Sequence, residues 1–301
     1  MYAILGAQML KMLVYIGVGF ILCRAKLISR QSSSALSQLL LYVILPCVIV
    51  DAYLSTTEDR TGEVLLSLGL GALALLVAMA IARLIFSREP IDQFCAAFSN
   101  AGFFGIPLVS GVLGQDAVIY VSGMVALLNC LQWSYGQRII SGKKGSFAEV
   151  LKNPLLIAFL VGILLLLLQI PVPGVISENI HAFAACNAPV AMVILGVSVG
   201  SQRLSGIFTL PRAYGVSAVR LLLIPAVTIL MLWLIPAADL EMKLALVLAA
   251  SAPVGSNVVV YTQRCGIDNG YSSKVVCLST ILSLASMPVL VLAAQWLLSC
   301  K

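Results

Sequence analysis

The chain of 301 residues contains ten apolar stretches, most of them about 20 residues long, that are separated by short polar connections. A helix of about 20 apolar residues spans the hydrocarbon core of a bilayer, which is about 30 Å thick. Charged residues make up 10% of the chain, against about 25% in soluble domains. The sequence therefore predicts an all-α integral membrane protein with ten spans. These are residues 2–22, 35–56, 63–86, 92–113, 117–137, 153–170, 176–200, 211–235, 242–264 and 272–298.

Lysine and arginine are distributed unevenly among the short loops. Of the 18 basic residues, three lie on one side of the predicted membrane and two lie within spans. The other thirteen are Arg24, Lys26, Arg30, Arg83, Arg88, Arg138, Lys143, Lys144, Lys152, Arg203, Arg212, Arg264 and Lys274. Because short cytoplasmic loops are enriched in basic residues, both termini are expected outside. The net charge of +6 then reflects topology, so no nucleic acid partner is expected. The uncharged N-terminus indicates a retained first span and not a signal peptide.

Two of the apolar stretches contain clusters of residues that weaken helices. One cluster runs from Ser99 to Pro107, and the other runs from Ser251 to Asn257. A lipid-facing helix cannot be broken inside hydrocarbon, because its backbone groups would lose their hydrogen-bond partners. Transporters use interrupted helices to hold substrate near the middle of the membrane. The two clusters therefore predict that spans 4 and 9 are interrupted and cross there.

The positions of the two clusters also predict an internal repeat. Five spans precede the longest polar connection and five follow it, and an odd number of spans inverts the second copy in the membrane. We expect the first five-helix repeat at residues 1–137, a cytoplasmic connecting loop at 138–152, and the second, inverted repeat at 153–301. An offset of 152 residues aligns Ser99 with Ser251, which supports the repeat weakly.

The two clusters suit an anionic ligand. Half-helix N-termini carry a partial positive charge, and asparagine amides donate and accept hydrogen bonds without a fixed charge. Glycine allows the backbone to approach a ligand, and proline prevents a break from closing into continuous helix. A passive kink is the alternative, because Gly and Pro are common in membrane helices. The predicted substrate-binding residues are Asn100, Gly105, Pro107, Pro253, Ser256, Asn257 and Arg220.

Three charged residues lie well inside the predicted spans, away from the span ends, where such residues are functional candidates. Arg220 either attracts an anion toward the crossing or pairs with a backbone carbonyl. Lys11 and Asp51 lie on spans 1 and 2, and we expect a structural ion pair between them. The alternative is that Asp51 couples transport to an ion by carrying a proton. Asn129 and Gln132 are expected to form interhelical hydrogen bonds and not to bind ligand.

Several classes of protein are excluded by what the sequence lacks. The eight cysteines are scattered without a CxxC pair, and His181 is the one histidine, so no metal site, cofactor or disulfide is expected. The sequence has no glycine-rich phosphate loop, no GxSxG motif and no nucleophile–base set. We therefore expect neither an enzyme nor a protein that is driven directly by ATP.

Four motifs carry a resemblance to a known family. Residues 100–107 have the pattern NxGFxGIP, which resembles the fourth-span signature of the auxin efflux carrier family of PIN-like transporters. Residues 39–46 (LLLYVILP), 153–156 (NPLL) and 252–257 (APVxSN) are similar to the family's second, sixth and ninth spans. The long cytoplasmic loop of many plant members is missing, so the chain resembles a bacterial-type member.

The resemblance implies two inverted five-helix repeats. Spans 1, 2, 6 and 7 would form a scaffold, often dimeric, and spans 3–5 and 8–10 a transport domain that contains the crossing. It also implies a secondary transporter, an efflux carrier or permease, that moves a small organic carboxylate by alternating access. The expected partners are this anion, the lipid bilayer and a second copy of the chain, and the expected location is a bacterial inner membrane.

Two other functions remain open from the sequence. A bile-acid/sodium symporter-like carrier has the same plan of ten spans with crossed helices. It would need several oxygen ligands for sodium, and no Asp or Glu lies beside either break. A membrane ligand sensor on the same fold would normally carry an appended soluble domain, and none is expected here.

Overall fold

The computed structural model describes residues 2–56, 60–142, 150–202, 204–267 and 270–299. Within these residues the regular structure is helical, apart from one isolated antiparallel bridge between Ser99 and Val254. Seven helical stretches are long and apolar enough to cross a membrane, which confirms the all-α membrane class. They are Ala3–Arg24, Gln31–Leu54, Thr61–Ile85, Asp116–Ser141, Gly174–Gly200, Pro211–Trp233 and Tyr271–Ser299.

The first half of the chain has one interrupted stretch, formed by α5 (Pro90–Ala97), the π-helix η2 (Ala101–Gly105) and α6 (Ile106–Leu113). The other helices of this half are α1 (Tyr2–Arg24), α2 (Arg30–Leu39), η1 (Leu40–Ile44), α3 (Leu45–Leu54), α4 (Thr61–Ile85), η3 (Asp116–Val118), α7 (Ile119–Leu131), η4 (Gln132–Gly136) and α8 (Gln137–Ser141). They are either single or follow one another without a gap, as α2, η1 and α3 do.

The second half also has one interrupted stretch, formed by α16 (Leu240–Ala250) and α17 (Asn257–Arg264). The helix α10 is shorter than the predicted sixth span and has 15 residues. The other elements are α10 (Pro154–Leu168), α11 (Gly174–Ala185), α12 (Asn187–Gly200), α13 (Leu204–Phe208), α14 (Pro211–Ala218), η5 (Val219–Leu223), α15 (Ile224–Trp233) and α18 (Tyr271–Ser299).

Three of the π-helices precede a proline by two residues, and the prolines are Pro46, Pro107 and Pro225. Proline has no N–H group and its ring clashes with the carbonyl of residue i−4. A π-turn widens the helix at that carbonyl and removes the clash. The helix therefore continues through Pro107. Pro107 was expected to keep the first break open, but the break lies before Pro107, because helical structure resumes at Ala101.

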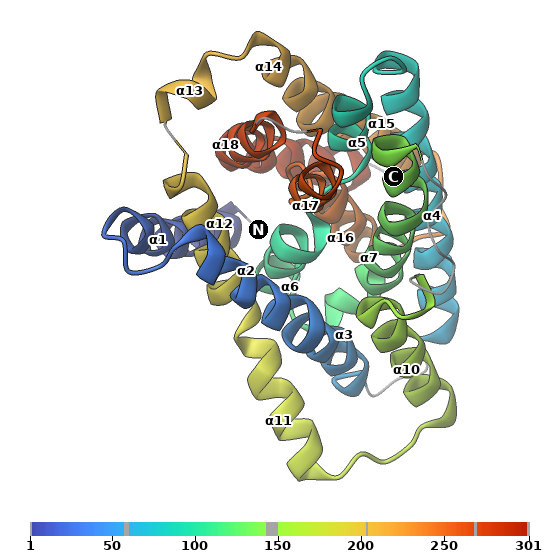
Figure 1. Ribbon diagram of the computed structural model, residues 1–301. Helices are drawn as coiled ribbons and strands as arrows, with labels where there is room; N and C mark the ends of the chain where they lie inside the picture. Colours follow the sequence, from blue (N-terminus) through green and yellow to red (C-terminus); the bar gives the residue numbers. More distant parts are fainter. Residues whose placement is uncertain (1, 57–59, 143–149, 203, 268–269, 300–301) are drawn as a thin grey trace.

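Helices α1 and α12 lie side by side and pack backbone against backbone (Figure 1). A β-carbon added at Gly19 would overlap the carbonyl oxygen of Val193, and one added at Gly196 would overlap that of Ile16. Small residues at an interface allow membrane helices to approach this closely. The two glycines therefore set the spacing of this helix pair.

A second close contact joins α1 to α6. The buried Gln8 side chain donates from Nε2 to the carbonyl oxygen of Pro107, at 3.0 Å. The same side chain fills the space above Gly111, where an added β-carbon would overlap it. The amide of Gln8 is thus fitted into the surface of α6, on the far side of η2 from the first break.

Two predicted connections differ from the structure. The connection between the first two predicted spans, residues 23–34, is partly helical. Helix α2 begins at Arg30, because the Ser29 side chain accepts from the Ser32 backbone N–H at 3.1 Å and caps the helix. The connection expected at 138–152 begins in helix, since α8 extends to Ser141. Residues 143–149 of that connection lie outside the described residues.

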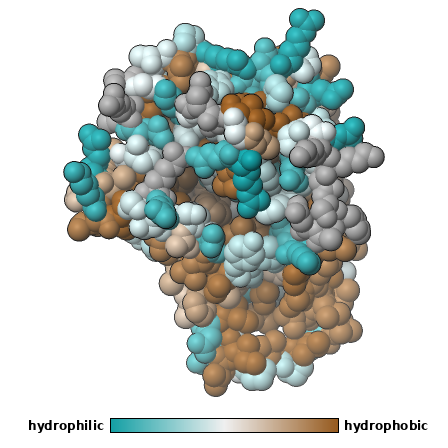
Figure 2. Space-filling view, in the orientation of Figure 1, coloured by the Kyte–Doolittle hydropathy of each residue, from teal (hydrophilic) through white to brown (hydrophobic). Residues whose placement is uncertain are grey.

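The surface is divided into two regions. In Figure 2 hydrophilic residues gather over the upper end of the molecule, and hydrophobic residues cover the lower part, where α10 and α11 lie. Many of the apolar side chains on these two helices are exposed, among them Leu164, Leu167 and Val175. Such a surface fits contact with lipid.

Candidate functional site

The two interrupted stretches meet at their breaks. The Asn100 backbone N–H donates to the Pro253 carbonyl oxygen at 2.7 Å, and the Gly255 N–H donates to the Phe98 carbonyl oxygen at 2.9 Å. The Val254 N–H donates to the Ser279 hydroxyl oxygen on α18, at 3.2 Å. These bonds satisfy backbone groups that the missing helical turns leave free. The two breaks therefore support each other, although they lie far apart in the sequence.

Gly255 allows this close approach. A β-carbon at this position would lie 3.2 Å from the carbonyl oxygens of Phe98 and Ser99, and equally close to the side-chain nitrogen of Gln132. A larger residue would push the two extended segments apart. Glycines in the two clusters were predicted to let the backbone approach a ligand; at Gly255 the approach is of one backbone segment to the other.

A small polar cavity lies directly at the crossing. Its volume is about 20 Å³, enough for one water molecule. Three predicted site residues line it, namely Asn100, Ser256 and Asn257. The remaining lining residues are Leu41, Leu45, Ser99, Gly102, Phe103, Leu128, Asn129, Gln132, Leu155 and Gly255. The structure thus brings together side chains from both breaks, from η1 and from the α7–η4 stretch.

The two asparagines differ in their hydrogen bonds. Asn257 donates from Nδ2 to Oε1 of Gln132, at 2.6 Å. Asn100 is buried, and its Nδ2 has no hydrogen-bond partner. A buried donor without a partner is unfavourable by about 1–3 kcal/mol. Among the described residues, Asn100 thus has an unused buried donor on a side chain that lines the cavity.

Gln132 lies at the site, although its sequence context predicted only an interhelical hydrogen bond. Its hydrogen bond with Asn257 joins two stretches of helix, as predicted for this residue, but it also lines the cavity and is buried. The π-helix η4 begins at Gln132. The available signal was a pair of amides, Asn129 and Gln132, one helical turn apart in an apolar span.

A larger cavity of about 700 Å³ continues from the small one, since Leu41, Phe103, Ser256 and Asn257 line both. Its mouth is solvent-exposed at Gln31, Gln263 and Arg264. Most of the other lining side chains are hydroxyls, amides, aromatic rings or aliphatic groups. They are Ser33, Ser34, Ser37, Gln38, Tyr42, Trp133, Ile194, Leu195, Val197, Ser198, Val259, Val260, Ser273 and Val276. Arg264 is the one charged residue among those that line it.

The Arg220 side chain is buried and binds backbone carbonyls. Nη1 donates to the carbonyl oxygens of Ala96 and Ala97, at 3.1 and 3.3 Å, and Nη2 donates to that of Ala250. These carbonyls belong to the last turns of α5 and α16. Of the two roles predicted for Arg220, the structure shows the pairing with carbonyls, and Arg220 lines neither cavity.

The other predicted site residues lie close to the crossing without lining a cavity. Pro253 contributes its carbonyl oxygen to the pairing of the two breaks. Gly105 packs against the end of α16, where a β-carbon would lie 3.2 Å from Cα of Ala249. Pro107 accepts the hydrogen bond from Gln8. These residues position the site, and Asn100, Ser256 and Asn257 face it.

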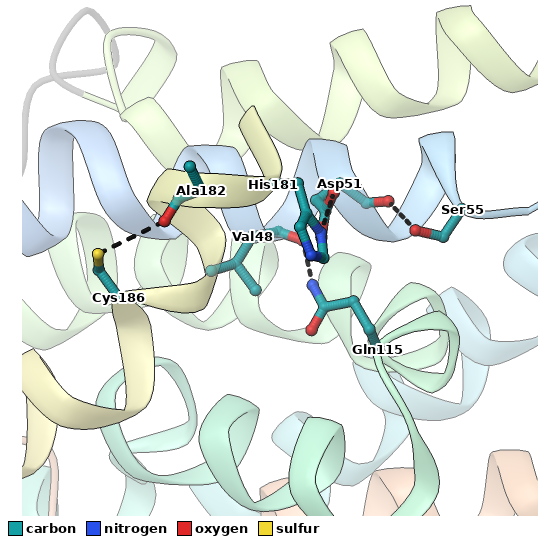
Figure 3. A network of polar contacts seen from close by, with 7 residues as sticks. All are labelled: Val48, Asp51, Ser55, Gln115, His181, Ala182 and Cys186. Carbon is teal, nitrogen blue, oxygen red and sulfur yellow. Dashed lines mark hydrogen bonds and ion pairs between the residues drawn. The ribbon is translucent and has the colours of Figure 1, made fainter. Parts of the chain in front are cut away.

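Asp51 lies in a separate polar contact, which Figure 3 shows between α3 and α11. Its buried carboxylate is 3.2 Å from Nδ1 of His181, whose side chain is 70% exposed. Nearby, Gln115 donates from Nε2 to the carbonyl oxygen of Val48, at 3.4 Å. The ion pair expected between Lys11 and Asp51 is wrong, because α1 packs along α12, and Lys11 is exposed.

A family model for membrane transport proteins matches residues 5–150 and 146–291 of the chain. The chain belongs to this family. The resemblance to auxin efflux carriers that the sequence motifs carry is thereby confirmed. A membrane transport protein of this kind is a transporter and not an enzyme, and it resides in a lipid bilayer.

Two relatives extend over most of the chain. One, an "Uncharacterized transporter" of Methanothermobacter thermautotrophicus, is 26% identical over 299 residues, which cover 93% of this chain and 95% of the relative. The other, a "Putative malonate transporter" of Rhizobium meliloti, is 23% identical over 271 residues, which cover 84% of each chain. Both names agree with the transporter family.

Proposed function

We propose that this membrane transport protein is a secondary transporter, an efflux carrier or permease, that moves a small organic carboxylate by alternating access. The observation that carries the proposal is the unpartnered Nδ2 of Asn100, which is buried at the crossing beside a polar cavity. A carboxylate oxygen supplies the acceptor that this donor lacks, and a hydrogen bond to a charged group contributes about 1.5–3 kcal/mol.

The electrostatics of the crossing support an anion. The N-terminal ends of η2 and α17 lie at the breaks, beginning at Ala101 and Asn257, and both carry a partial positive charge. None of the described residues that line the two cavities is acidic. A sodium site often includes a carboxylate among its oxygen ligands, and its absence from these linings makes the sodium-coupled alternative less suitable. Malonate, named for the Rhizobium relative, is the first dicarboxylate to test.

The direction of access follows from the large cavity. Its mouth contains Gln31 and Arg264, and Arg264 belongs to a loop that the charge distribution assigns to the cytoplasm. The described state is then open to the cytoplasm, with both chain termini outside. In the opposite state the cavity would close and the same crossing would face outward.

Two inverted five-helix repeats, residues 1–137 and 153–301, explain several features of this structure. Each contains one interrupted stretch, α5 with α6 and α16 with α17. Each also places an arginine beside a tyrosine. Tyr120 donates to Oε2 of Glu63 at 2.7 Å and accepts from Arg60.

In the second group of this kind, Arg212 pairs with Asp92, and its guanidinium lies 5.4 Å from the Tyr271 ring centroid. Both carboxylates, Glu63 and Asp92, belong to the first half, but an arginine–tyrosine contact in each half is what an internal repeat would produce. Ten spans, a homodimer and a bacterial inner membrane complete the proposal by resemblance to the family.

The proposal is tested by reconstituting the purified protein in liposomes and measuring uptake of labelled mono- and dicarboxylates. The pH gradient, sodium gradient and membrane potential are varied independently. We expect uptake of a small dicarboxylate such as malonate without a need for sodium. If only a sodium gradient supports uptake, the symporter alternative holds. If no carboxylate in the series is bound or carried, the proposal fails.

Asp51 is the proposed proton carrier. Asp51→Asn preserves the shape of the side chain but removes its titration, so uptake driven by a pH gradient should fall to the level seen without a gradient. Exchange of labelled for unlabelled substrate needs no net proton movement and should persist. Glu178→Gln, which neutralises an exposed carboxylate on α11, is the matched control. Full pH stimulation in Asp51→Asn would remove the proton role from this residue.

A further inference from the structure

The Arg220 guanidinium joins the C-terminal ends of two half-helices. It reaches the last carbonyls of α5 through Ala96 and Ala97 and the last carbonyl of α16 through Ala250. Among the described residues, no ion pair connects Arg220 with a carboxylate. Its positive charge is therefore balanced by peptide carbonyls alone.

This arrangement changes the balance of charge at the crossing. Each helix C-terminus carries about half a negative charge and each N-terminus about half a positive charge. Two C-termini, those of α5 and α16, and two N-termini, those of η2 and α17, meet at the breaks. Without Arg220 these four partial charges would cancel. With it, the two C-termini are neutralised and the two N-termini remain.

We propose that Arg220 sets the sign of charge that the crossing accepts, by neutralising both half-helix C-termini, and that it does so without touching the transported anion. The inference rests on the proposed carriage of a carboxylate and assigns its charge selectivity to one residue. The Asn100 side chain provides independent support, because it is buried, lines the same cavity and has no hydrogen-bond partner for Nδ2. Arg220 is thus a positioning and selectivity residue.

The expected size of the effect follows from Coulomb's law. A unit charge about 10 Å from a ligand, at an effective dielectric constant of about 20, changes the affinity of a singly charged ligand by about tenfold. An uncharged ligand of the same size should be unaffected. The difference between charged and neutral probes therefore separates an electrostatic role from a structural one.

The experiment uses Trp133, which lines the large cavity, as a reporter of the local potential. In a background with Trp233→Phe and Trp296→Phe, quenching of Trp133 fluorescence is measured with iodide, caesium and acrylamide. Arg220→Gln removes a positive charge, so it should lower the ratio of iodide to acrylamide quenching at least twofold. It should raise the ratio of caesium to acrylamide quenching. Arg220→Lys should stay close to the parent. Unchanged ratios in a folded Arg220→Gln variant would overturn the inference.

A second measurement avoids dependence on the folding of Arg220→Gln. A buried lysine loses its charge more readily than arginine as pH rises. Raising the pH should therefore lower the iodide ratio in Arg220→Lys and leave it unchanged in the parent, and the absence of this difference would contradict the proposal. Because iodide reports the local potential and not the transported ligand, this measurement distinguishes failure of the inference from failure of the proposed carriage of a carboxylate. Malonate carries two negative charges at neutral pH, so its affinity should fall by about a hundredfold in Arg220→Gln.

Discussion

Replacing Asn100 by alanine should weaken binding of the transported carboxylate by about ten- to a hundredfold. The variant loses a hydrogen bond from a buried amide to a charged acceptor, which contributes about 1.5–3 kcal/mol. It should fold normally, because the unpartnered Nδ2 disappears with the side chain. Binding of malonate per folded molecule, measured by calorimetry on purified protein, gives the result directly.

Asn257→Ala should behave differently. It also removes a predicted ligand, but it leaves Oε1 of the buried Gln132 without its donor. We therefore expect a lower melting temperature together with weaker binding. Asn179→Ala, an exposed amide on α11 away from both cavities, is the matched control for asparagine substitution. If Asn100→Ala and Asn257→Ala both bind with parental affinity, the crossing is not the substrate site.

Gly19→Ala should destabilise the protein by about 3 kcal/mol, the upper end of the range for overpacked interiors. The added methyl group would overlap the Val193 carbonyl oxygen, and neither helix backbone can move away without opening the α1–α12 contact. Gly17→Ala is the control on the same helix, because no atom lies within 4 Å of its added β-carbon. Thermal unfolding in detergent should therefore show a fall of several degrees for Gly19→Ala and little change for Gly17→Ala. Equal melting temperatures would contradict the packing described here.

The helices and the two breaks were predictable because both depend on local composition. A run of 20 apolar residues or a Pro/Gly/Asn cluster within such a run has the same meaning wherever it occurs in the chain. The length of the first break was not predictable, since Pro107 interrupts a regular α-helix but is accommodated by the preceding π-turn. That accommodation depends on packing that the sequence does not display.

The partners of the polar groups were harder to predict than their positions. Asp51 pairs with His181 and not with Lys11 because helix contacts, which depend on the tertiary fold, decide which side chains meet. Similarly, Gln132 was recognisable as an interhelical residue, but its place beside Asn257 requires knowledge of where the second break lies. Asn100, Ser256 and Asn257 could be identified from local sequence, because they lie at the breaks and the breaks form the cavity.

The Gln8 amide fitted above Gly111 has a consequence for the transport cycle. Any sliding of α6 along α1 would carry Gly111 away and bring a bulkier neighbour under the amide, so the hydrogen bond to Pro107 and the fit are lost together. This contact therefore holds α6 at one position along α1. In the proposed alternating-access cycle, the barrier between the two states would include withdrawal of the Gln8 amide from α6, a helix that contains no residue lining either cavity.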